Sequence, residues 1–200
     1  MAMQLTLTNM IQFLGAISPL LVGFFLISAS ILNQNIKGLI FMGGVMFAFV
    51  LNALLMNVIK SPANPQRSPG CSIIEWPFSL NAYNSPSWNS VFLAFTLAYM
   101  YLPMAFGGTM NYGVIIALVS LLGLDAISKI TNLCTTTLGI VLGVVFGLIL
   151  GGLWYGINKA SGNPQLLYFE EVSNGETCSR PSKQTFKCAV YKNGKLIKNL

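Results

Sequence analysis

Three short stretches of the chain carry side chains that could hold a phosphate group. They read NVIKSPANPQRSPGC (57–71), SPSWNSVF (85–92) and LDAISKITNLCTTTLGIVLG (124–143), and each lies at the border of an apolar run. Cationic side chains neutralise phosphate, while hydroxyls and helix N-terminal amides donate hydrogen bonds to its oxygens. Converging on one face, these stretches would form a phosphate or lipid-headgroup site. Its candidate residues are Lys60, Arg67, Ser87, Asn89, Ser90, Lys129 and Thr135.

The composition places such a site in a membrane protein. Of the 200 residues, 54% are hydrophobic and only 8% are charged, whereas soluble domains carry about 25% charged residues. The formal net charge is +6, but the basic residues do not alternate with aromatic ones on any predicted face. This pattern argues against nucleic acid as a partner. We expect an integral membrane protein with basic loops and with membrane lipids as its first partners.

Five apolar runs are each near the ~20 residues that a helix needs to cross a bilayer. They cover about 10–32, 38–59, 89–107, 111–127 and 136–157. The fourth run is short, and a tilted or partly re-entrant segment is an open alternative for it. The sequence therefore predicts an all-α, polytopic transmembrane helical bundle over residues 1–157, followed by a polar tail over 158–200. Pro19 and Pro103 lie inside spans, where neighbouring helices can satisfy the carbonyl groups that proline frees.

The orientation follows from the lysines and arginines on each side of the predicted bundle. With five crossings, the N-terminus and the loops 60–88 and 128–135 share one face, which carries only Lys60, Arg67 and Lys129. The other face carries Lys37, Lys159, Arg180, Lys183, Lys187, Lys192, Lys195 and Lys198. By the positive-inside rule, the C-terminal tail is cytoplasmic and the motif-bearing loops are lumenal or external.

The tail has a strand-like pattern of its own. QLLYFEEV (165–172) is predicted to be a strand, and TFKCAVYKNGKLIKNL (185–200) two strands joined at Asn193-Gly194. An Asn-Gly pair between such runs is the strongest short signal for a β-hairpin. We therefore expect a small C-terminal β-hairpin, which is a candidate contact for a protein partner.

The four cysteines divide between the two faces. Cys71 and Cys134 fall on the expected lumenal face and are the candidate disulfide pair, whereas Cys178 and Cys188 in the tail are expected to remain thiols. The chain has no histidine and no Cys-x-x-Cys spacing. We therefore expect neither a metal site nor a cofactor.

The fifth apolar run contains a stripe of glycines at a spacing of four: Gly139, Gly143, Gly147 and Gly151. Small residues at this spacing leave a smooth groove into which another helix can pack closely. We expect that helix to belong to the same chain. A homo-oligomer formed through span five is the alternative.

The first two stretches resemble motifs of the type 2 phosphatidic acid phosphatase family, including its dolichyl-diphosphatase-like branch. The family's first motif is Lys, six residues, then Arg-Pro; Lys60 and Arg67 have this spacing, with Ser68 where the proline would be. The second motif is Pro-Ser-Gly-His-Ser at the start of a helix. Here it reads Pro-Ser-Trp-Asn-Ser over 86–90, so that Asn89 occupies the histidine position.

The third stretch resembles the family's third motif, which is Ser-Arg, five residues, His, three residues, Asp, and a Gly four further on. Ser128 and Lys129 take the first two places, Thr135 falls at the histidine position, and Gly139 at the aspartate position. Gly143 matches the glycine. The order of the three motifs and their placement beside the spans agree with the family over about residues 38–157.

The departures from the family decide what the resemblance implies. In the family, the third-motif histidine is the nucleophile, held by the aspartate, and the second-motif histidine protonates the leaving group. Thr135 and Asn89 can do neither without a new base. The resemblance therefore implies a pseudoenzyme, a non-catalytic membrane protein with a structural or scaffolding role, in a virion or organelle membrane for example. Lys129 in place of arginine loses the bidentate fork, so retained binding of lipid phosphate headgroups would be weaker.

Several alternatives stay open. The chain could be an active lipid phosphate or polyprenyl diphosphate phosphatase with Thr135 as a substituted nucleophile, or the motif match could be a coincidence in a structural protein. A channel or transporter is disfavoured, because the spans carry almost no ionisable residues and no internal repeat. Lys60 at a span end could simply extend toward the membrane surface. Asp125 and Lys129, four residues apart, could form a local ion pair.

Overall fold

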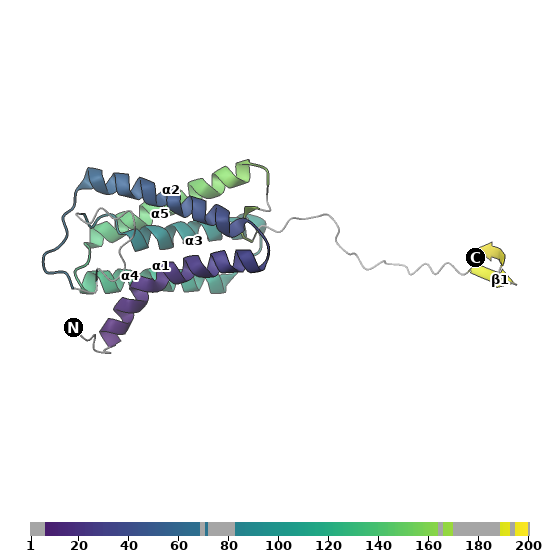
Figure 1. The fold of residues 1–200 in the computed structure, drawn as a ribbon, viewed down its shortest axis with the longest axis horizontal. Helices are drawn as coiled ribbons and strands as arrows, with labels where there is room; N and C mark the ends of the chain where they lie inside the picture. Colours follow the sequence, from purple (N-terminus) through teal and green to yellow (C-terminus); the bar gives the residue numbers. More distant parts are fainter. Residues whose placement is uncertain are drawn as a thin grey trace.

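The computed structural model describes residues 7–68, 71, 83–163, 166–169, 189–192 and 195–199. The elements in this part of the chain are α1 (Leu7–Leu32), α2 (Lys37–Ile59), α3 (Trp88–Gly107), α4 (Tyr112–Thr131), α5 (Thr137–Ala160), β1 (Ala189–Lys192) and β2 (Lys195–Asn199) (Figure 1). All five helices are long and apolar enough to cross a membrane. The predicted multi-pass membrane protein is thereby confirmed.

Helix α4 is longer than its apolar run. It has 20 residues and ends at Thr131, so it is not a short re-entrant segment. The sequence placed 128–131 in a loop because these residues are polar. In the structure Ser128 is buried, and Gly15 of α1 packs against it and against the backbone of Asp125. Ser128 can continue the helix here because α1 covers it.

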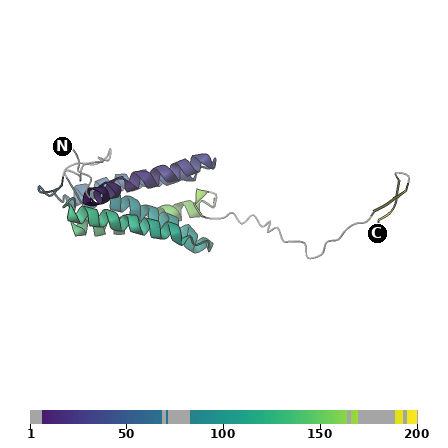
Figure 2. The ribbon, with the colours of Figure 1, turned by 90° about the horizontal axis from the view of Figure 1, so that it is seen from below.

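Helix α3 lies at the centre of the bundle. Its most apolar stretch is 67% buried, compared with 39% or less in the other four helices. Figure 1 shows it between α2 on one side and α1 and α4 on the other. Aromatic rings fill its contact with α2: Phe41 lies about 6 Å, centroid to centroid, from the rings of Phe92, Phe95 and Tyr99. Seen from below in Figure 2, the helices of the bundle run roughly along one common direction.

The glycine stripe of α5 packs against α3. A Cβ atom added to Gly147 would collide with the carbonyl oxygen of Val91, and one added to Gly151 would collide with that of Phe95. At Gly143 the added atom would lie 3.0 Å from the carbonyl oxygen of Ser87. The stripe therefore lets the two backbones touch within one chain. This geometry occupies the surface that the alternative of a homo-oligomer would have used.

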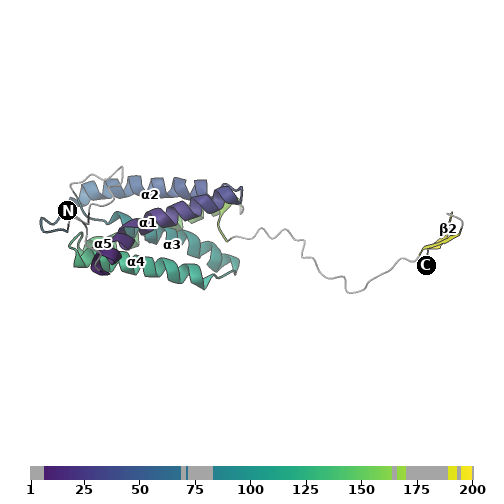
Figure 3. The same cartoon turned by 60° about the horizontal axis from the view of Figure 1, so that its bottom comes forward.

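Helix α1 crosses the bundle between α2 and α4, as Figure 3 shows. Its first part diverges from the direction of the remainder in Figure 1. Pro19 lies inside the helix, and proline removes one hydrogen bond and clashes with the preceding turn, which bends a helix. The carbonyl that loses its helical partner is that of Gly15, four residues earlier.

The bundle has two ends, which we name by their connections. The loop end comprises residues 60–68, 71 and 83–87, together with the turn 132–136 between α4 and α5. The tail end comprises the turns 33–36 and 108–111 and, after α5, residues 161–163 and 166–169. This assignment follows from the alternating directions of five consecutive helices.

Residues 166–169 are not the predicted strand. They form turns, and the side chain of Leu167 is completely buried against the core of the bundle. The apolar side chains that suggested a strand are covered by helices instead of by a partner strand. Further along the chain, β1 pairs antiparallel with β2, with Ala189 opposite Asn199 and Lys192 opposite Lys195. Asn193-Gly194, Cys178 and Cys188 lie outside the described residues.

Candidate functional site

The three stretches that carry the candidate residues meet at the loop end. The backbone N–H of Asn84 donates to the Ser61 carbonyl at 3.0 Å, which joins the first stretch to the chain entering α3. The Ser68 N–H donates to the Asn132 carbonyl at 3.1 Å, and the Ser87 N–H to the Gly139 carbonyl at 3.1 Å. Backbone hydrogen bonds thus hold all three stretches together, independently of their side chains.

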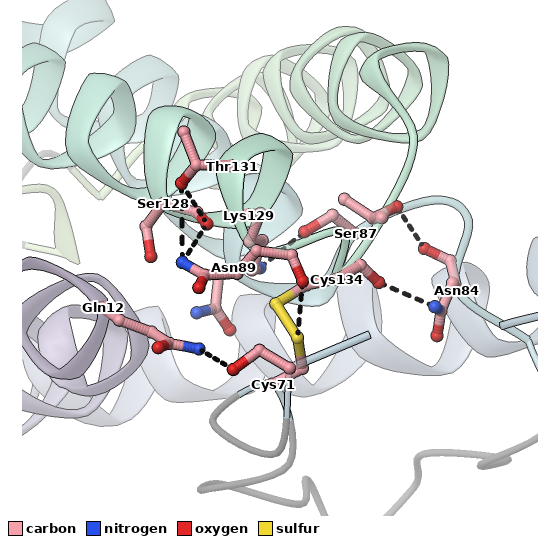
Figure 4. Close-up of a disulfide and its surroundings, with 12 residues drawn as sticks. Gln12, Cys71, Asn84, Ser87, Asn89, Ser128, Lys129, Thr131 and Cys134 are labelled. Atoms are coloured by element: carbon pink, nitrogen blue, oxygen red, sulfur yellow. Dashed lines mark hydrogen bonds between the residues drawn. A yellow bond between two sulfur atoms is a disulfide. The ribbon is translucent and has the colours of Figure 1, made fainter. Parts of the chain in front are cut away.

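A disulfide reinforces this convergence. Cys71 and Cys134 are bonded through their sulfur atoms, although they are 63 residues apart in the chain (Figure 4). In the chain-entropy description, closing a loop of this length stabilises the folded state by about 4 kcal/mol. Next to it, the Asn84 side-chain amide donates to the Cys134 carbonyl at 2.7 Å. The disulfide and this hydrogen bond fix the turn between α4 and α5.

Asp125 is the centre of a buried polar cluster, which we define as Ser87, Asn89, Ser90, Asp125 and Lys129. The Asp125 side chain is only 1% exposed. One of its oxygens accepts from the Asn89 amide at 3.1 Å and lies 3.2 Å from the Lys129 ammonium nitrogen. The other oxygen accepts from the Ser90 hydroxyl at 3.2 Å. A buried carboxylate needs such a set of donors, because it has lost its water.

Lys129 is held inside the same cluster. Besides its ion pair with Asp125, its ammonium donates to the Ser87 hydroxyl at 2.7 Å. Ser87 is the N-cap residue of α3, but its side chain makes no capping hydrogen bond to the helix. The hydroxyl that would usually cap the helix therefore accepts a hydrogen bond from Lys129 instead. The positive charge of Lys129 is neutralised by Asp125 within the protein.

Asn89 connects the cluster to the bend in α1. Its amide nitrogen donates to Asp125 and also lies 3.4 Å from the carbonyl oxygen of Gly15. That carbonyl is the one that Pro19 leaves without a helical partner, and the Ser18 hydroxyl also donates to it at 3.0 Å. An amide group suits this position, because it has two N–H donors for two acceptors. Asn89 thereby links α1, α3 and α4.

The remaining candidate residues lie elsewhere. Thr135 donates its hydroxyl hydrogen to the Asn84 carbonyl at 2.8 Å, at the turn between α4 and α5. Lys60 is the C-cap residue of α2, in the left-handed conformation with φ 50°, and its side chain is exposed. Arg67 is also exposed. Within the described part of the chain, neither of these two cations has a side-chain hydrogen bond or ion pair.

The geometry therefore divides the seven candidates. Ser87, Asn89, Ser90 and Lys129 come together around Asp125. Asn89, Ser90 and Lys129 direct donors at this carboxylate, and Ser87 accepts from Lys129. A phosphate at the same place would compete with Asp125 for these donors and would be repelled by its charge. Lys60, Arg67 and Thr135 lie around this cluster, not in it.

Sequence reasoning missed the central role of Asp125 and the contribution of Gly15. The ion pair between Asp125 and Lys129 was predicted as a local feature, and its N···O distance is 3.2 Å. What the sequence did not reveal is that donors from α3 complete it. The usable signal was Pro19, which marks Gly15 as an unsatisfied carbonyl, but the identity of its partner depends on helix packing.

No protein-family model matches this chain, and neither does a curated protein or a solved structure.

Proposed function

We propose that this chain is a non-catalytic, multi-span membrane protein in which a phosphatase-like frame serves as a structural scaffold. One observation supports the proposal above all. Asn89, at the position of the family's acid-donating histidine, is only 7% exposed and makes structural contacts with Gly15 and Asp125. An amide does not titrate near neutral pH and cannot protonate a leaving group.

Thr135 supports the same proposal at the position of the nucleophile. Its hydroxyl hydrogen is donated to the Asn84 carbonyl, which is not a base that can accept a proton. A threonine needs an adjacent base to become nucleophilic. Asp125 is the carboxylate of the cluster, and it is already engaged by Asn89, Ser90 and Lys129. The chain has no histidine to take over either role.

The scaffold is oriented, in this proposal, with its loop end outside the cytoplasm. The Cys71–Cys134 disulfide belongs to this end, and disulfides persist in oxidising compartments. The excess of lysine and arginine on the opposite side points the same way. Protease added to sealed vesicles should remove the tail when the cytoplasmic side of the membrane faces outward, and should leave it intact in vesicles of the opposite orientation. Digestion of the tail in intact cells, from outside, would reverse the assignment.

The two exposed cations and the tail give the scaffold its contacts. Lys60 and Arg67, exposed at the loop end, are available to the phosphate groups of surrounding lipids. In the tail, residues 178–200 contain six basic residues and no acidic one. We propose the tail, with its hairpin, as the contact for a protein layer beneath the membrane, in a virion or an organelle for example.

A phosphatase assay tests the absence of catalysis. The full chain is reconstituted into nanodiscs with phosphatidic acid or a polyprenyl diphosphate, and released inorganic phosphate is measured. We expect no release above that of empty nanodiscs, while an active lipid phosphatase in the same discs releases phosphate. Turnover that disappears in Thr135→Ala or Asn89→Ala, in variants that keep the helical circular dichroism of the parent, would refute the proposal.

A further inference from the structure

A cleft of about 310 Å³ with both polar and apolar lining residues opens at the loop end, beside the buried cluster. It lies between the end of α4 and the start of α5, and the chain segments around residues 61–64 and 84 form its other walls. Its polar lining residues are Ser61, Asn64, Asn84, Thr135, Thr136 and Thr137. Ligand pockets have volumes of roughly 300–1,000 Å³, so this cleft has room for one small group.

Part of the polar lining is already used by the protein. Thr135 donates to the Asn84 carbonyl, Thr136 accepts from the Gly139 N–H at 3.1 Å, and the Asn84 amide nitrogen donates to Cys134. The hydroxyls of Ser61 and Thr137 have no partner among the described residues, and neither has the side-chain oxygen of Asn84. The Asn64 side-chain oxygen accepts from the Gln66 N–H, while its amide nitrogen, like the groups just named, has no partner in the described part of the chain. The cleft thus offers two hydroxyls that donate and accept, one oxygen that accepts and one amide that donates.

A second observation concerns Ser85, which follows the lining residue Asn84 in the chain. The hydroxyl of Ser85 is buried without a hydrogen-bond partner among the described residues. A Cβ atom added to Gly139 would collide with this hydroxyl and would lie 2.6 Å from that of Thr135. Ser85 and Thr135 thus both approach the side of Gly139 where a Cβ atom would be. Unpaired buried hydroxyls are uncommon, because each costs free energy unless it has a hydrogen-bond partner.

The charge of the cleft decides which ligand it suits. None of its lining residues is charged, and the ammonium of Lys129 is directed to Asp125 and Ser87. A phosphate would lose water here without gaining a cation, and the free Asn84 oxygen would repel its oxygens. Hydroxyl groups of a ligand can donate to this oxygen and can both donate to and accept from Ser61 and Thr137.

We propose that the cleft binds an uncharged group rich in hydroxyls, of the size of a glycerol or a single hexose. The same chemistry is offered by the headgroup of a neutral glycolipid and by a free sugar. This proposal rests on the proposed function in one respect: a non-catalytic protein leaves the bound group intact.

Lipid retention in nanodiscs tests the proposal. The full chain is reconstituted with monoglucosyl diacylglycerol, with diacylglycerol of the same chains, or with phosphatidic acid, and lipids that remain bound after release are counted by native mass spectrometry. We expect the glucosyl lipid to be retained several-fold more than the other two. Competition with free methyl glucoside then identifies the source: displacement assigns recognition to the sugar alone, and retention assigns it to the intact lipid.

Two variants and one control make the assignment specific. Thr137→Val and Ser61→Ala each remove one free hydroxyl, and each should lower retention of the glucosyl lipid by roughly three- to tenfold, the value of one neutral hydrogen bond. Thr131→Val is the control, because the Thr131 hydroxyl donates to the Ile127 carbonyl of its own helix and does not line the cleft. It should leave retention unchanged.

Three results would overturn the proposal. These are equal retention of the glucosyl lipid and diacylglycerol, preferential retention of phosphatidic acid, and retention that neither Thr137→Val nor Ser61→Ala lowers. Release of inorganic phosphate from phosphatidic acid in these discs would refute the non-catalytic function instead. The two failures are therefore separate measurements on the same sample.

Discussion

The two ends of the bundle are held together by different chemistry. At the loop end, a buried carboxylate is shared by donors from α3 and α4, and a disulfide closes the surface. At the tail end, the contacts are neutral or aromatic. Leu167 is fully buried, and the rings of Phe106 and Tyr155 stack with centroids 6.1 Å apart. The Lys159 ammonium lies 4.7 Å from the centroid of the Phe106 ring, in a cation–π contact.

Most hydrogen bonds at the tail end join neutral groups among the described residues, although the Lys159 ammonium donates to the Tyr155 hydroxyl at 3.0 Å. The Tyr168 hydroxyl donates to the Leu26 carbonyl at 3.0 Å, and the Ser30 hydroxyl accepts from the Gly38 N–H at 2.9 Å. Burial raises the pKa of the Tyr168 phenol, so it remains a neutral donor at physiological pH. Losing one neutral bond costs about 1 kcal/mol, whereas removing one partner of a buried ion pair costs about 3–5 kcal/mol. The loop end should therefore tolerate substitution less than the tail end.

The largest effect is expected at Asp125. Asp125→Asn keeps the shape but leaves the buried charge of Lys129 without a counter-ion, so the free energy of unfolding should fall by about 3–5 kcal/mol. Unfolding by sodium dodecyl sulfate in mixed micelles measures this change. Adding Lys129→Met, which replaces the remaining charge by an apolar chain, should recover most of the loss. Lys60→Met, at an exposed cation, is the control, and a loss as large as that of Asp125→Asn would contradict this view.

The disulfide comes next. Cys134→Ser removes the cross-link between Cys71 and Cys134 and should lower the free energy of unfolding by about 2–4 kcal/mol. The same decrease should appear in the parent protein after reduction with dithiothreitol, and it should be absent when the variant is reduced. Non-reducing electrophoresis of the protein from its native membrane would show the cross-link as faster migration. Equal stability of oxidised and reduced protein would mean that the disulfide does not contribute to the difference between the two ends.

A substitution at the tail end should cost less. Leu167→Ala removes a fully buried side chain, for which losses of about 2–5 kcal/mol are usual. We expect a value near 2 kcal/mol, because residues 166–169 can detach from the bundle without opening its core. Leu153→Ala, at a side chain that faces the lipid, is the control and should have little effect. Faster amide hydrogen exchange confined to residues 166–169 would establish local detachment, whereas faster exchange throughout α3 would contradict it.

The sequence predicted the parts of this fold that depend on local pattern. Five apolar runs became five helices, because span length and hydropathy are properties of each segment alone. It favoured packing of the stripe from Gly139 to Gly151 within the chain, but it could not identify α3 as the partner, since several helices offer the same packing. It also mistook residues 166–169 for a strand, because apolar side chains that dock on helices resemble those of a strand. Such outcomes depend on contacts between segments.

The candidate site shows the same limit more sharply. The motif spacings identified stretches that do meet at the loop end, yet they gave no reason to expect that Asp125 would draw in Ser90 and Asn89. A carboxylate in a spanning helix must find donors, and proline in a span must leave a carbonyl unpaired. Both needs can be read from the sequence. That one residue, Asn89, serves both follows only from the packing of α3 beside both α1 and α4.

The smallest effect, and the most direct test of the comparison, comes from a matched pair of hydrogen bonds to carbonyls of α1. Tyr168→Phe deletes the bond to Leu26, but Leu26 lies in a regular part of the helix where the N–H of Ser30 also reaches its carbonyl. The loss should be at most about 1 kcal/mol. Asn89→Leu deletes the contact with Gly15, whose carbonyl has no helical donor because of Pro19, and it also takes a donor from Asp125. Here the loss should reach about 2–3 kcal/mol, since buried acceptors are left unsatisfied. Unfolding in mixed micelles compares the free energies of unfolding of the two variants directly. Equal losses would mean that the bend in α1 does not make the loop end more sensitive to substitution than the tail end.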